Sequence, residues 1–280
     1  MSLCRAPAFF IFIFVSQIHA QIVTSIYPIK SILAEIVPDP IYIHCLVPPS
    51  ASPHIHELLP SDFRLSGKAR VLIYGGNGLD KWAEEIPDIQ KISILPLVPD
   101  SLRLYPENLK KSSFNPHFWT DPLVVRAMLP ILADTLCTVF PIDRDKIMNK
   151  TILFSNRLDT LNLELKKLLL PLGGTAVLSS HPFFQYFLKR YGFKISGIIE
   201  EIPGKEPTPK VIQRIIAAVD KSNIRAVLTH PQLSDRTAQM ISESTGIKII
   251  ELDPLGGTEG RIRYTDLLMH NARQLKEVLN

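Results

Sequence analysis

Short apolar runs alternate with amphipathic segments along most of this chain. The apolar runs are rich in Ile, Val and Leu and have the length of buried strands; they lie at residues 22–26, 41–47, 71–74, 92–95, 176–178, 195–199, 226–228 and 247–252. Apolar residues at helical spacing follow at 29–37, 62–69, 79–85, 123–140 (interrupted at Pro130), 183–191, 209–221, 235–244 and 264–279. Alternation of strands and helices predicts parallel sheets covered on both faces, so we expect an α/β fold.

One segment near the middle breaks this rhythm. Residues 142–170 contain no glycine and no proline, in a sequence with 13 Gly and 23 Pro. Apolar residues recur there at helical spacing among Lys, Asn and Glu. At ~1.5 Å per residue this predicts a helix of roughly 40 Å, long enough to span a small domain. We therefore expect an N-terminal α/β lobe at 21–141, a linking helix at 142–170 and a C-terminal α/β lobe at 171–280.

Length and charge agree with two lobes and give no reason to expect nucleic acid as a partner. The chain has 280 residues, of which 46% are hydrophobic, enough for a full core in each lobe. Its formal net charge is only +4, and basic and acidic residues are interspersed. No patch combines basic and aromatic residues in the manner of a base-stacking surface.

The N-terminus has the pattern of an export signal. Arg5 precedes an apolar run at 9–15, and Ala20 is a small residue before the expected cut at Gln21. The run is much shorter than the roughly 20 apolar residues of a membrane span. We expect a cleaved signal peptide at 1–20 and a soluble periplasmic protein, because no cysteine follows the cut as in a lipoprotein.

An exported protein can form disulfides, and two cysteines remain after the cut. Cys45 lies in a strand-like run and Cys137 in a helix-like one. The sequence leaves open whether they pair or are two separate buried thiols.

Polar side chains that can bind a metal follow the predicted strands. His54 and His181 each come after a strand, His117 precedes a helix, and Asp253 follows the last strand. Ligands of open α/β sheets bind at the carboxyl ends of the strands, so these four residues are candidates for one shared site. Three imidazoles and a carboxylate form a four-coordinate set suited to Zn²⁺, whereas carboxylate-rich sites favour manganese, magnesium or calcium.

Each of these residues also has a simpler explanation. A lone histidine near a strand end is more often a hydrogen-bonded or surface side chain than a ligand. His56 lies two residues from His54 and can be the ligand in its place, although the two face opposite ways on an extended segment. Asp253 precedes a proline and can simply begin a turn.

Four ordered motifs resemble signatures of one family, the metal-binding solute receptors of ABC importers for zinc and manganese. They are Pro-His-Ile-His-Glu-Leu-Leu-Pro-Ser-Asp at 53–62, Asn-Pro-His-Phe-Trp-Thr-Asp-Pro at 115–122, Ser-His-Pro-Phe-Phe-Gln-Tyr-Phe at 180–187 and Glu-Leu-Asp-Pro-Leu-Gly at 251–256. The resemblance covers nearly the whole chain after the signal. It implies two open α/β lobes joined by one long rigid helix, with the metal in the cleft between them.

The same resemblance implies the ligands and the partners. Carried over residue by residue, the ligands are His54, His117, His181 and Asp253. Zinc is favoured over manganese as the transported ligand, because manganese-specific relatives tend to have Glu at the position of His181. The implied partners are the metal ion and an inner-membrane ABC permease, and we expect a monomer.

The chain departs from the family pattern at two places. The family often has Glu-Pro-Gln where this chain has His230 followed by Pro-Gln, so His230 is a candidate auxiliary ligand. Zinc members often carry a long loop rich in His and acidic residues, whereas the loop at 99–116 contains no histidine before His117. Metal scavenging by that loop is therefore not expected, and its absence slightly weakens the choice of zinc over manganese.

Two other classes of function compete with a non-enzymatic binding protein. A secreted zinc-dependent hydrolase needs a general base beside a metal-bound water. The sequence has no His-Glu-x-x-His pattern, and Glu57, Glu200 and Glu201 are the candidate bases. A surface adhesin is suggested only by export and by the family's history of being called adhesins; the sequence has no repeats and no low-complexity stalk.

Overall fold

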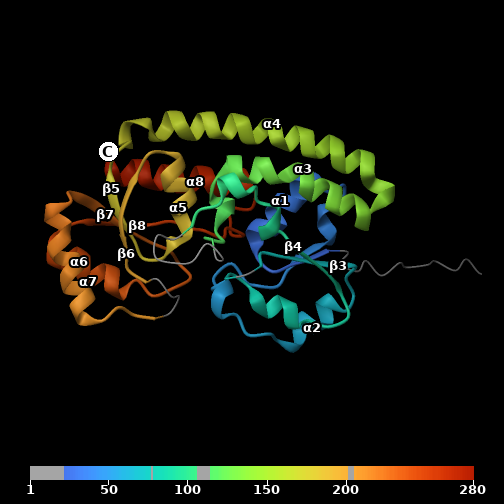
Figure 1. Cartoon of the computed structure of the whole chain (residues 1–280), viewed down its shortest axis with the longest axis horizontal. Helices are drawn as coiled ribbons and strands as arrows, with labels where there is room; N and C mark the ends of the chain where they lie inside the picture. The colour runs from blue at the N-terminus through green and yellow to red at the C-terminus, as the bar shows by residue number, and fades with distance from the viewer. Residues whose placement is uncertain (1–21, 77, 106–113, 201–204) are drawn as a thin grey trace, which may run out of the picture.

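The computed structural model describes residues 22–76, 78–105, 114–200 and 205–280. Within these residues the chain forms two four-stranded sheets, each all-parallel, in two lobes that lie side by side (Figure 1). The expected α/β architecture is therefore confirmed. The predicted signal peptide at 1–20 lies outside the described residues.

The two sheets have the same strand order. The first consists of β1 (Ile22–Thr24), β2 (Ile43–Cys45), β3 (Val71–Tyr74) and β4 (Gln90–Ser93) in the order β2-β1-β3-β4. The second consists of β5 (Ala176–Ser179), β6 (Lys194–Ile198), β7 (Ile224–Thr229) and β8 (Lys248–Glu251) in the order β6-β5-β7-β8. Every residue of the central strands β3 and β5 is buried, as expected for parallel strands covered on both faces.

The helices cover these sheets. The first lobe has α1 (Tyr27–Ile36), α2 (Pro60–Ser66) and α3 (Pro122–Val139). The second lobe has α5 (Gln185–Arg190), α6 (Pro209–Lys221), α7 (Arg236–Thr245) and α8 (Tyr264–Leu279). Two predicted helices differ: 79–85 contains only a 3₁₀ helix at Lys81–Glu85, and 183–191 begins with a 3₁₀ turn at Pro182–Phe184 before α5.

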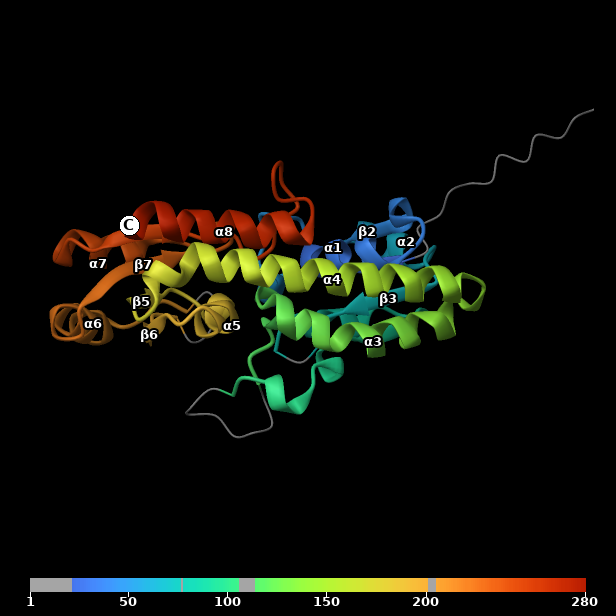
Figure 2. The ribbon, with the colours of Figure 1, turned by 90° about the horizontal axis from the view of Figure 1, so that it is seen from above.

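The predicted linking helix is a single unbroken α4 (Arg144–Leu169), flanked by 3₁₀ turns at Pro141–Asp143 and Leu170–Leu172. It runs along both lobes (Figures 1 and 2), packing on α1 and α3 of the first lobe and on α8 of the second. One stripe of the helix is buried, at Ile147, Thr151, Phe154, Leu158, Leu161, Leu165 and Leu169. These residues recur every three or four positions, so one buried face of α4 packs against both lobes.

The expected interruption at Pro130 is wrong, because α3 continues through it. Pro130 is exposed, while Leu129, Leu132 and Ala133 beside it are fully buried. Packing of the buried face maintains the helix, and the lost backbone hydrogen bond lies on the solvent side. By length and composition α3 is apolar enough to cross a membrane, but its buried apolar residues belong to the main hydrophobic core.

The two cysteines do not pair. Cys137 is buried in α3, and Cys45 is half-buried at the end of β2. Of the alternatives that the sequence left open, the structure shows two separate free thiols.

Candidate metal centre

Three of the predicted ligands converge at the boundary between the lobes. His54 lies in a 3₁₀ turn after β2, His117 lies just before the 3₁₀ turn that leads into α3, and His181 directly follows β5. One ring nitrogen of each lies within 4.8 Å of the others, and the Nε2 atoms of His54 and His117 are 3.0 Å apart. We call these residues the three-histidine cluster.

The spacing of the three rings fits a single tetrahedral ion. Their centroids are 5.2 Å apart for His54 and His117, 5.1 Å for His54 and His181, and 5.2 Å for His117 and His181. Imidazoles that bind one zinc tetrahedrally at about 2.0–2.1 Å have ring centroids about 5 Å apart. The cluster therefore has the geometry of three ligands of one ion.

The other ring nitrogen of two of these histidines is held by the surrounding chain. Nδ1 of His117 lies 2.7 Å from Oδ1 of Asn115, and Nδ1 of His181 lies 3.3 Å from the backbone oxygen of Glu200. Because both partners are acceptors, Nδ1 is the protonated nitrogen in each ring, and the lone pair of Nε2 is left for a metal. Nε2 of His181 is buried and has no hydrogen-bond partner among the described residues.

Asn115 is itself fixed from the second lobe. Its Nδ2 donates to the backbone oxygen of Pro182 at 2.9 Å and to Oε1 of Gln185 at 2.7 Å. Its Oδ1 also accepts from the backbone N–H of His117 at 2.9 Å. The residue that orients His117 is therefore bound to the segment that follows His181.

The electrostatic environment keeps the cluster neutral. Burial lowers the pKa of His54 to about 4 and, with smaller contributions from the charges of His54 and His230, the pKa of His181 to about 3. The pKa of His117 is well below its ordinary value, first because of burial and then because of the neighbouring histidines. Only neutral imidazole can bind a metal, so the cluster is ready to ligate at neutral pH.

An aromatic side chain that the sequence argument did not single out packs against the cluster. Phe183 is fully buried, and its ring centroid lies 5.9 Å from that of His54, 4.4 Å from His117 and 4.7 Å from His181. It excludes water from one side of the site and strengthens the electrostatic interactions there. Its place two residues after His181, inside the third motif, was the available signal.

The fourth predicted ligand lies outside the cluster. The carboxylate of Asp253 is buried, and Nη1 of Arg261 lies 3.2 Å from its Oδ2. Its Oδ1 accepts from the backbone N–H groups of Leu255 and Gly256, each at 3.0 Å. Both carboxylate oxygens are thus engaged by the chain itself. No pattern in the sequence singled out Arg261.

The two other histidines considered from the sequence are not part of the cluster either. Nε2 of His56 lies 3.1 Å from Oδ2 of Asp62, and its ring packs on Trp82. His230 is buried with its ring centroid 6.1 Å from that of His181, and neither of its ring nitrogens is within hydrogen-bond geometry of a described residue. Burial lowers its pKa to about 4, so His230 is also neutral.

The candidate bases of a hydrolase differ in their surroundings. The side chain of Glu57 is exposed, Glu200 is buried and its backbone oxygen orients His181, and Glu201 lies outside the described residues.

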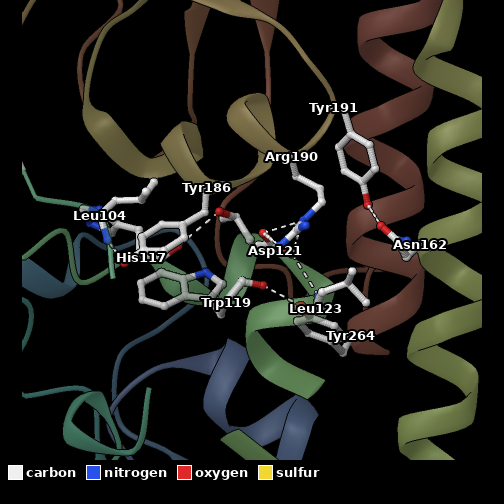
Figure 3. Close-up of polar contacts among 11 residues, drawn as sticks. Leu104, His117, Trp119, Asp121, Leu123, Asn162, Tyr186, Arg190, Tyr191 and Tyr264 are labelled. Atoms are coloured by element: carbon white, nitrogen blue, oxygen red, sulfur yellow. Dashed lines mark hydrogen bonds and ion pairs between the residues drawn. The ribbon is translucent and has the colours of Figure 1, made fainter. Parts of the chain in front are cut away.

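A polar network fastens the segment after His117 to the second lobe (Figure 3). Arg190 of α5 contacts both oxygens of Asp121, and Tyr264 of α8 donates to the backbone oxygen of Trp119 at 2.6 Å. Tyr191 donates to Oδ1 of Asn162 on α4 at 3.3 Å. The residues that carry His117 and His181 are therefore joined to each other and to the long helix.

Comparisons with known proteins point to one family. The sequence profile of "ZnuA: Zinc-uptake complex component A periplasmic" matches residues 22–278. A protein of Thermotoga maritima described as metal-binding is 29% identical over 261 residues, covering 92% of each chain. The manganese-binding lipoprotein MntA of Halalkalibacterium halodurans is 25% identical over 261 residues, covering 90% of this chain and 85% of its own.

The fold is also that of a solved protein. A crystal structure of ZnuA superposes with a TM-score of 0.81 at 24% identity, covering 94% of this chain and all of the other. At that identity the likeness shows the shared fold of two α/β lobes and a long connecting helix.

Proposed function

This chain belongs to the ZnuA family of periplasmic zinc-uptake components, and we propose that it captures a divalent transition metal outside the cytoplasmic membrane and delivers it to an ABC importer. The observation that carries this proposal is the three-histidine cluster, in which neutral imidazoles lie at tetrahedral spacing. The protein is a binding protein and not an enzyme in this proposal, because three neutral imidazoles converge on one ion position.

Capture takes place between the lobes. His54 and His117 come from the first lobe and His181 from the second, so one ion bound to all three bridges them. The network around Asp121 and the continuous helix α4 oppose a wide hinge opening. Binding and release therefore take place with small movements of the loops that carry the histidines.

We infer that zinc is the favoured cargo, with manganese as the alternative. Imidazole nitrogen suits zinc, and affinity for nitrogen-rich sites rises from manganese toward zinc. Relatives of this chain are named for each metal, so the family alone does not decide between them. Asp253 is the proposed fourth ligand, a weaker one than each histidine, because its carboxylate must first exchange a present partner for the ion.

We also propose the cellular setting that the sequence indicated. The chain is exported with cleavage of residues 1–20 and acts in the periplasm as a monomer, with the metal ion and an inner-membrane permease as its partners. Nucleic acid has no role in this proposal.

The experiment is metal analysis of protein purified without added metal, followed by competition titration. We expect about one zinc per chain and displacement of bound manganese by zinc. Hydrolytic turnover of ester or peptide substrates by the zinc-loaded protein, without tight retention of the ion, would overturn the proposal.

A further inference from the structure

The carboxylate of Asp253 forms an ion pair with Arg261 of the same chain. Arg261 reaches Oδ2 at 3.2 Å, and backbone N–H groups together with Nε2 of Gln232, at 3.4 Å, lie against Oδ1. The side chain of Asp253 is 5% exposed, so water has little access to the carboxylate of this ion pair. A metal that binds Oδ2 of Asp253 competes with the guanidinium for this oxygen.

Arg261 is held in this position by its own turn. Its backbone N–H donates to the oxygen of Thr258 at 2.9 Å, and its oxygen accepts from the N–H of Gly257 at 3.0 Å. Gly256 has φ +70°, and a Cβ added there would lie 2.7 Å from the backbone oxygen of Arg261. The close approach of these segments requires glycine, so the turn that presents Arg261 is built into the loop.

Competition between Arg261 and the metal for the carboxylate of Asp253 affects zinc affinity and manganese affinity differently. Three imidazoles alone form a donor set that suits zinc, and solvent can complete its coordination. Manganese is the harder ion and gains more from carboxylate oxygen. Keeping Asp253 away from the ion therefore weakens manganese binding more than zinc binding.

We propose that Arg261 is a specificity-determining residue that, by holding the carboxylate of Asp253, keeps the metal site dominated by imidazole and disfavours manganese. This inference rests on the proposed function of the three-histidine cluster. It assigns to Asp253 a share in zinc binding that is smaller than that of each histidine.

The test is a double-mutant cycle on the full chain, with zinc affinity from chelator competition and manganese affinity from the electron paramagnetic resonance signal of free Mn²⁺. The variants are Arg261→Gln, Asp253→Asn and the two combined. Freed from its partner, Asp253 can ligate, so Arg261→Gln should tighten manganese binding by about tenfold or more, the scale of outer-sphere effects on metal sites. The gain for zinc should be smaller, and both gains should disappear when Asp253→Asn is added.

Two controls separate ligation from simple charge removal. Arg263→Gln removes a neighbouring cation whose ion pair, at 3.3 Å, is with Glu35, so it should leave both affinities unchanged. Arg261→Lys keeps the charge and should keep most of the discrimination. If the gain in manganese affinity persists in the combined variant, it comes from removing the repulsion between Arg261 and the metal ion and not from ligation by Asp253. That result would overturn the proposal.

A spectroscopic measurement keeps the proposal testable even where Arg261→Gln does not fold. The visible spectrum of the Co²⁺ form should differ only slightly between the unaltered protein and Asp253→Asn, because Arg261 limits ligation by Asp253 in the unaltered protein. A large spectral change, or a loss of zinc affinity equal to that of His117→Ala, would show that Asp253 already ligates and that Arg261 does not withhold it. Failure of the proposed function would look different, since the unaltered protein would then bind neither zinc nor manganese.

Discussion

Arg190 joins the two lobes by contacting both carboxylate oxygens of Asp121. Its Nε lies 3.0 Å from Oδ1 and 2.8 Å from Oδ2, and Nη2 lies 2.8 Å from Oδ2. The side chain of Asp121 is 4% exposed and that of Arg190 is 30% exposed. Because Asp121 follows His117 and Arg190 follows His181, the pair helps to hold the two ligands at a fixed spacing.

Loss of this pair should destabilise the whole protein. Arg190→Ala leaves a buried carboxylate whose remaining donor among the described residues is the backbone N–H of Leu123, at 2.9 Å. Breaking a fully buried pair costs about 3–5 kcal/mol, and the partial exposure of Arg190 reduces the expected loss to about 2 kcal/mol. Urea unfolding of the metal-free protein measures it.

The matched control is the exposed pair of Arg126 and Asp159, whose side chains are 47% and 46% exposed. Arg126→Ala should cost no more than about 1 kcal/mol. Equal losses for the two variants would contradict a special role of the Asp121–Arg190 pair.

Stability of the metal-free protein should fall as the pH falls below neutrality. The pKa of His54 is lowered to about 4 and that of His181 to about 3, whereas an unfolded histidine titrates near 6.5. Between about pH 6.5 and these folded values the unfolded chain binds more protons than the folded one, so acid favours unfolding. Each such histidine contributes a slope of about 1.4 kcal/mol per pH unit in that window.

Urea unfolding at pH 7, 6 and 5 checks this dependence. His54→Ala should reduce the slope, because one buried neutral imidazole is gone. A stability that stays constant from pH 7 to pH 5 would show that the histidines are hydrated and titrate normally.

Asn115 should act as a positioning residue for His117. Asn115→Ala removes the acceptor that holds Nδ1 of His117 and fixes its tautomer. Loss of such a partner typically costs 10–100-fold in metal affinity, so we expect a loss of about tenfold or more for zinc.

Gln185→Ala is the matched control, because it removes one partner of the Asn115 amide and leaves the contact with His117 intact. It should weaken zinc binding much less. If Asn115 had a merely structural role, Asn115→Ala would lower stability and leave zinc affinity unchanged. Asn115→Asp keeps an acceptor for Nδ1 of His117 and should therefore retain part of the zinc binding.

Much of the fold could be predicted from the sequence, because it depends on local patterns. The absence of Gly and Pro between 142 and 170 predicts α4, and the alternating apolar runs predict both parallel sheets. Pro130 misled the prediction, because the packing of α3 on the core overrides a local helix breaker on the solvent side.

The histidines of the site could be predicted because each lies in a recognisable sequence motif. His54, His117 and His181 meet as expected. The engagement of Asp253 by Arg261 could not be foreseen, since it depends on how a loop of several glycines folds back on itself. The contact of Asn115 with Gln185 likewise joins segments of different lobes, and no local pattern encodes it.

The most direct test of the three-histidine cluster is a zinc competition titration on single alanine variants. His54→Ala, His117→Ala and His181→Ala should each lose zinc affinity by at least about 100-fold, because each removes one of three converging nitrogens. His56→Ala, which removes the contact with Asp62 outside the cluster, and His230→Ala should change it far less. Loss of binding in His56→Ala or His230→Ala, with one of the three cluster histidines dispensable, would contradict the assignment of the site.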